Sequence, residues 1–156
     1  MKKLAVGMEI IIPDGELAPT SYGSSKVNIN EPVHNNTGIP NYGGYYMRPI
    51  AGGVKTQGLH GYNAVDLASY IGTPIFASAD GDVIVSRYGG WNGGYGNYVV
   101  IAHDNGTQTL YAHMSKQIVF GGYHVVQGQV IGYMGSTGKS TGSHLHFEIR
   151  GAVNPF

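Results

Sequence analysis

Two histidines stand two residues apart near the C-terminus, in the alternating stretch HLHFEIR at 144–150. Successive side chains of a β-strand point to opposite faces, so His144, His146 and Glu148 would share one face while the apolar residues between them share the other. Two imidazoles on one face can direct nitrogen atoms toward a single point, as a metal site requires. The pattern also fits a half-buried strand whose histidines face water, and the pair alone does not decide between these interpretations.

An aspartate in the middle of an apolar run favours the metal interpretation. Asp66 lies in NAVDLAS at 63–69, where its neighbours on the same strand face are alanines and those on the opposite face are aliphatic. A carboxylate at the centre of a strand is costly to bury unless it is paired or binds a metal. With His60 and one member of the 144/146 pair, it would complete a set of two histidines and one carboxylate. Catalytic zinc uses such sets and keeps a fourth position for water.

A further histidine, His113, follows another β run in TLYAHMS at 109–115 and would share a face with Tyr111. A histidine beyond those that hold a metal can act as a general base or as a donor to a developing oxyanion. It can equally be a core histidine bonded to a carbonyl. Because His144 and His146 are displaced by about 6.6 Å along a strand, one would bind the metal and the other would act on the substrate. Spacing does not say which.

The composition narrows the class of protein. The 156 residues suffice for one domain, and the nine basic and nine acidic residues balance, so we expect no nucleic-acid partner. The absence of cysteine excludes disulfides and thiolate metal sites. No apolar run approaches the ~20 residues of a membrane helix, so we expect no membrane insertion. We take the chain to be a monomer.

The 26 glycines, 12 tyrosines and few charged residues are typical of a turn-rich β protein. Residues 14–44 are rich in Gly, Pro, Asn and Ser, whereas from Tyr45 onward short β-branched runs alternate with turn signals such as Asn105-Gly106. We therefore predict an N-terminal arm or linker at 1–44 and an antiparallel all-β domain at 45–156. The opening MKKLAVGMEIIIP fits a strand better than an export signal, because Glu9 and Pro13 interrupt it.

Several runs in this domain resemble the LytM/lysostaphin-type zinc endopeptidases of the M23 family, which cut peptide bonds in bacterial peptidoglycan. They are HGYNAVDLASYIGTPIFASADGDV, YGNYVVIAH, LYAHMS, VVQGQVIGYMGSTGKSTGSHLHFEIR and the terminal NPF. The resemblance covers essentially all of residues 45–156. It implies an all-β fold, an antiparallel β-sheet groove of the duplicated hybrid motif type, with an extended N-terminal arm.

The resemblance also implies the roles of the site residues. His60, Asp66 and His146 would hold one Zn²⁺ ion, and His113 and His144 would be the catalytic histidines. The reaction would be hydrolysis of a peptidoglycan stem peptide or cross-bridge by a metal-activated water. The substrate in turn implies a secreted protein with an extracellular or cell-envelope location.

Two further features bear on this resemblance. The family commonly has a shorter gap between its first histidine and the aspartate, whereas five residues separate His60 from Asp66 and Tyr62 stands at the usual histidine position. We retain His60, because tyrosine is a poor zinc ligand. Residues 4–16 resemble the last strand of a LysM peptidoglycan-binding module, which would make the chain a fragment of a longer exported protein.

Two loops would line the substrate groove, RYGGWNGGYGNY at 87–98 and GSTGKSTGS at 135–143. They carry side chains able to stack on substrate or to meet a carboxylate, which are Tyr88, Trp91, Tyr95, Tyr98 and Lys139. The main alternative function is a non-catalytic module of the same fold that binds peptidoglycan or activates a hydrolase. A β-sandwich lectin or phage structural module is a third class, but it leaves a buried Asp66 unexplained.

Overall fold

The computed structural model describes residues 38–156. The LysM-like stretch at 4–16 and most of the predicted arm lie outside these residues. The described part contains nine strands, which are β1 (Val54–His60), β2 (Ala64–Ala68), β3 (Pro74–Phe76), β4 (Gly81–Arg87), β5 (Asn97–Ala102), β6 (Gln108–Gln117), β7 (His124–Val125), β8 (Val130–Met134) and β9 (His144–Arg150). Its one helical element is a short 3₁₀ turn at Asn92–Gly94.

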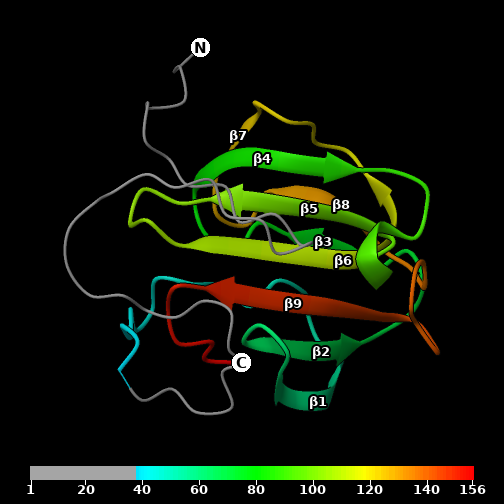
Figure 1. The fold of residues 1–156 in the computed structure, drawn as a ribbon, viewed down its shortest axis with the longest axis horizontal. Helices are drawn as coiled ribbons and strands as arrows, with labels where there is room; N and C mark the ends of the chain where they lie inside the picture. Colours follow the sequence, from blue (N-terminus) through cyan, green and yellow to red (C-terminus); the bar gives the residue numbers. More distant parts are fainter. Residues whose placement is uncertain (1–37) are drawn as a thin grey trace.

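The strands form an antiparallel sheet in the order β1-β2-β9-β6-β5-β4-β7, as Figure 1 shows. Strand β8 pairs with both β3 and β6, and the β3–β8 pair lies behind the main sheet in that view. The prediction of an antiparallel all-β domain is confirmed. Strand β9, the last in sequence, lies between β2 and β6. The C-terminal histidines are thereby brought beside the strand that carries Asp66.

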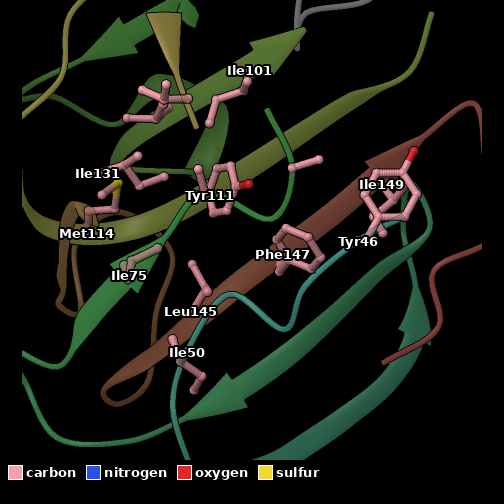
Figure 2. Packing of buried hydrophobic residues seen from close by; sticks show 14 of the residues in the cluster. Tyr46, Ile50, Ile75, Ile101, Tyr111, Met114, Ile131, Leu145, Phe147 and Ile149 are labelled. Carbon is pink, nitrogen blue, oxygen red and sulfur yellow. The ribbon is translucent and has the colours of Figure 1, made fainter. Parts of the chain in front are cut away.

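The apolar face of β9 forms the centre of the core. Leu145, Phe147 and Ile149 are fully buried and belong to one apolar cluster with Ile75 of β3 and Ile131 of β8. Figure 2 shows Ile149 beside Tyr46 at the other end of this cluster. Burial of each such side chain contributes about 1.5–3 kcal/mol. The alternation of HLHFEIR is thereby fixed, because a shift of one residue would expose this apolar set to water.

The neighbouring strand β2 obeys the same alternation. Val65 and Leu67 are buried in the core, as predicted. Asp66 lies between them and is directly opposite His146 in the β2–β9 register, and Ala68 is opposite His144. Opposed residues of an antiparallel pair share a face. The register that the core imposes therefore places the carboxylate and both histidines on one side of the sheet.

The turn between β1 and β2 is fastened to the C-terminal segment by two asparagines. Asn63 has a left-handed backbone (φ 60°), and its side-chain amide donates hydrogen bonds to the carbonyls of Ile149 (2.7 Å) and Ala152 (2.6 Å). Asn154 in turn donates to the Asn63 carbonyl (2.9 Å). This turn contains the residues that widen the spacing between His60 and Asp66, and Asn63 fastens it to β9 and to the segment that follows.

Asn63→Ala should lower the free energy of unfolding by about 2–4 kcal/mol. The variant leaves two buried carbonyls without hydrogen-bond donors. It also puts alanine at a positive φ, a backbone conformation that asparagine tolerates better than alanine does. Asn63→Gly is the matched control, since it removes the hydrogen bonds but relieves the backbone strain. Urea unfolding of the three proteins measures both effects. A loss below about 1 kcal/mol in Asn63→Ala would contradict this account of the turn.

Candidate metal centre

Three of the predicted site residues converge at the end of β1, the middle of β2 and the middle of β9. His60, Asp66 and His146 each offer one ligand atom, and these atoms lie within 4.8 Å of one another. Asp66 Oδ1 is 3.4 Å from His60 Nε2 and 3.0 Å from His146 Nδ1. The structure therefore brings together the two imidazoles and the carboxylate that the family resemblance implied as a ligand set.

These distances suit a zinc ion. Ligands that bind zinc tetrahedrally at 2.0–2.1 Å lie about 3.3 Å from each other, close to the two separations measured around Asp66 Oδ1. The donor set of two imidazole nitrogens and one carboxylate oxygen is that of a catalytic zinc site. The three side chains are 13–22% exposed, so the site is shielded but open to a water molecule or a substrate group.

The hydrogen bonds around His60 orient it for this role. Its Nδ1 donates to the Gly58 carbonyl (2.7 Å), so that Nε2 is the ring nitrogen directed at Asp66. Tyr62, at the usual family position of the histidine, is 43% exposed, and its ring lies 5.7 Å from the guanidinium carbon of Arg150. The arrangement favours His60 over Tyr62 as the third ligand.

His113 and His144 lie beside this cluster. Their ring centroids are 4.7 Å apart, and the ring of His113 is 5.8 Å from that of His146. His144 Nδ1 donates to the Gly142 carbonyl (2.9 Å), and its Nε2 is 3.9 Å from Asp66 Oδ2. All five predicted site residues thus occupy one face of the sheet.

The prediction that His113 shares a face with Tyr111 is wrong. Tyr111 packs on Phe147 in the core, with ring centroids 5.2 Å apart, whereas His113 lies on the opposite face beside His144. The cause is a left-handed backbone at His113 (φ 60°), within a part of β6 where the register with β5 shifts. Such a bulge adds a residue and reverses the alternation. Strained backbone of this kind is concentrated at functional sites.

The two glycine-rich loops hold His113 in place. Its Nδ1 donates to the Thr137 carbonyl (2.8 Å), and its backbone N–H donates to the Tyr95 carbonyl (2.9 Å). The loops themselves meet where Lys139 N–H donates to the Gly94 carbonyl (2.7 Å). A Cβ atom on Gly138 would overlap the backbone of the other loop, so glycine is required for this close approach.

Burial and neighbouring charges set the protonation of the site. The pKa of His113 is lowered to about 4, chiefly by burial and then by the nearby His144 and His146, against the opposing hydrogen bond to Thr137. Burial alone would lower the pKa of His146, but its hydrogen bonds to Asp66 and Glu148 raise it to about 9. For Asp66 the effects have the opposite sign: burial alone would raise its pKa, but the hydrogen bond to His146 holds the pKa below its usual value. At neutral pH, Asp66 and His146 therefore form a carboxylate–imidazolium pair, and a cation bound here would have to displace the proton between them.

Sequence reasoning missed the residues beneath His146. Glu148 is fully buried, and its Oε1 accepts hydrogen bonds from His146 Nε2 (3.1 Å) and the Tyr95 hydroxyl (2.7 Å). Its Oε2 accepts from Arg150 Nε (2.7 Å). The alternation of β9 already placed Glu148 on the face of His146, and continuing it to Arg150 would have suggested this pair.

The aromatic residues of the 87–98 loop differ in exposure. Tyr88 and Trp91 are 77% and 60% exposed, so they are available to contact a substrate as predicted. Tyr98 is buried, so the prediction that it stacks on substrate is wrong. The Tyr95 hydroxyl is bonded to Glu148, below the histidines.

Comparison with known proteins gives this site a context. Residues 60–156 match the sequence profile of peptidase family M23. The chain is 50% identical over 107 residues to the DD-carboxypeptidase/endopeptidase Mpg of Neisseria meningitidis, covering 69% of this chain and 23% of Mpg. It is 48% identical over 89 residues to the peptidoglycan DD-endopeptidase ShyA of Vibrio cholerae, covering 56% of this chain and 20% of ShyA. The match thus spans less than a quarter of either relative.

A solved structure with the same fold is the catalytic domain of the antimicrobial peptidase lysostaphin from Staphylococcus simulans. The TM-score is 0.53 at 34% sequence identity, with 67% of this chain and 79% of that domain covered. The predicted fold of the LytM/lysostaphin type is confirmed. No helix within residues 38–156 is long and apolar enough to cross a membrane.

The ring of His113 should remain neutral from pH 8 down to about pH 4, because burial disfavours its charged form more than the Thr137 carbonyl favours it. Long-range ¹H–¹⁵N NMR spectra of the imidazoles, recorded through this range, measure the titration. His124, an exposed histidine bonded to Asp82, serves as the reference ring in the same spectra. A midpoint for His113 near 6.5 would contradict the buried, carbonyl-bonded geometry.

Proposed function

The chain belongs to peptidase family M23, and we propose from this premise that it is a zinc-dependent endopeptidase that hydrolyses peptide bonds in bacterial peptidoglycan. We assign this activity to residues 45–156. The observation that carries the proposal is the convergence of His60, Asp66 and His146 beside two further histidines. A module that only binds peptidoglycan has no need of all five side chains on one face.

Each histidine outside the ligand set has a geometry suited to proton transfer. Bound to His60, Asp66 and His146, zinc would supply a Lewis acid that polarises the scissile carbonyl and lowers the pKa of water to about 7. His113 is neutral, and its Nε2 lone pair is free of the hydrogen bond that Nδ1 makes to Thr137, so we assign it the role of general base.

His144 has the geometry of a donor. The Gly142 carbonyl fixes the proton on Nδ1, and Nε2 faces the Asp66 carboxylate. Protonated at Nε2 by solvent, His144 can donate a hydrogen bond to the oxyanion and then transfer that proton to the leaving amine, while His113 returns to solvent the proton that it took from the water. The two catalytic histidines would thus have separate tasks, although a backbone carbonyl accepts a hydrogen bond from Nδ1 of both rings.

The names of the relatives suggest which kind of peptide bond is hydrolysed. Mpg and ShyA are both named for DD-endopeptidase activity, so we propose that the substrate bond joins D-configured centres in peptidoglycan cross-links. The exposed Trp91 and Tyr88 offer apolar surface to such a peptide. A substrate of this kind places the working protein outside the cell or in the cell envelope.

Substitution of either catalytic histidine should separate chemistry from metal binding. His113→Ala and His144→Ala should each lower the rate of amine release from purified peptidoglycan by about 10²–10⁴-fold, as expected for loss of a general acid or base. Both variants should keep one zinc per chain by elemental analysis. Full activity in both would contradict the assigned roles, and zinc binding without any amine release by the wild-type chain would support the non-catalytic alternative.

Substitution of a ligand should instead remove the metal. Asp66→Ala and His146→Ala should lose stoichiometric zinc together with activity, because two remaining ligands do not hold the ion tightly. His124→Ala is the matched control, since it removes an exposed histidine whose partner is Asp82. Stoichiometric zinc in His146→Ala would refute the ligand set.

A further inference from the structure

We propose that Glu148 is a positioning residue that orients His146 for metal binding, and that Tyr95 and Arg150 hold Glu148 in this orientation. The inference rests on the proposed zinc function of the site. It concerns residues that lie beneath the ligands and contact neither the metal position nor the substrate face directly.

The first step is that the two ring nitrogens of His146 contact different carboxylates. Nδ1 lies 3.0 Å from Asp66 Oδ1, and Nε2 lies 3.1 Å from Glu148 Oε1. Metal binding through Nδ1 requires the ring proton to be on Nε2, where it needs an acceptor. Glu148 supplies that acceptor and also fixes the rotation of the ring about its bond to the chain.

The second step is the free-energy cost of burying the Glu148 carboxylate. It is fully buried, and its cross-strand neighbours Ala64 and Leu110 are also fully buried. An apolar side chain would pack between them without the desolvation cost of a carboxylate. The charged residue at this position is therefore explained by its polar contacts, to His146 on one oxygen and to Arg150 on the other, rather than by packing.

The third step is the set of donors that surrounds the carboxylate. Oε1 accepts from the Tyr95 hydroxyl (2.7 Å) as well as from His146, and Oε2 lies 2.6 Å from a terminal guanidinium nitrogen of Arg150. With donors on both oxygens, the carboxylate cannot rotate away from His146. The Tyr95 carbonyl also accepts a hydrogen bond from the backbone N–H of His113. Tyr95 therefore contacts both Glu148, which orients the ligand His146, and His113, the proposed base.

The test uses Glu148→Gln in the full chain, with zinc affinity measured by competition with a chromophoric chelator at pH 7. Glutamine keeps the volume, but its amide NH₂ must face either Arg150 or His146, where donors already point. Zinc should bind about 10–100-fold more weakly, as is typical when the partner of a ligating histidine is lost. The visible absorption bands of the Co²⁺-loaded variant should also shift, which a purely structural role would not cause.

Tyr111→Phe is the matched control, because it removes a buried hydroxyl, bonded to Ser78 and Thr109, from the opposite face of the same sheet. It should lower thermal stability while leaving zinc affinity within twofold of wild type. Wild-type affinity in a folded Glu148→Gln would overturn the inference.

If Glu148→Gln does not fold, the zinc affinity of Tyr95→Phe tests the inference instead. That variant keeps the carboxylate and removes one donor, and it should weaken zinc binding severalfold, whereas unchanged affinity would overturn the inference. Failure of the wild-type chain to bind zinc at all would instead refute the proposed function and the inference with it. The two failures are therefore distinguishable.

Discussion

The contact between Asp66 and His146 is the interaction on which the site depends. It joins β2 to β9, two strands far apart in the sequence, and it follows directly from their register. That register is set on the other side of the sheet, where Val65, Leu145 and Phe147 are fully buried. Hydrophobic burial thus positions the ligands, since any slip of β9 by one residue would both expose the core and remove the histidines from the carboxylate.

The face that carries the chemistry is itself partly a buried polar layer. Below His146, the side chains of Glu148, Arg150 and Tyr95 are hydrogen-bonded to one another, with Glu148 and Arg150 buried and Tyr95 partly buried. A buried network of this kind is costly when incomplete and rigid when complete. Its rigidity suits a site in which ligand atoms must be held within tenths of an ångström.

Strand periodicity was sufficient to predict much of this arrangement. The alternation of HLHFEIR and the apolar neighbours of Asp66 indicated a ligand set with one of His144 and His146, and the turn signals indicated an antiparallel sheet. The choice of His146 and the roles of His113 and His144 came from the family resemblance, and the five residues do lie on one face. The side of the sheet on which His113 lies was not predictable, because its left-handed backbone reverses the alternation and no local signal marks the bulge. Tyr98 is buried because it lies at the start of β5 and packs with Val100, Leu110 and Ala112. The bond from Tyr95 to Glu148 depends on how the loop before β5 folds, which periodicity does not describe.

The most direct test of the account is a crystal structure of the zinc-loaded chain with anomalous data at the zinc absorption edge. We predict one strong peak, about 2.0–2.2 Å from His60 Nε2, Asp66 Oδ1 and His146 Nδ1, with His113 and His144 beside it and unbound. A peak held by His113 and His144, or one from which Asp66 is turned away, would contradict the central claim that this carboxylate and these two imidazoles form the metal centre.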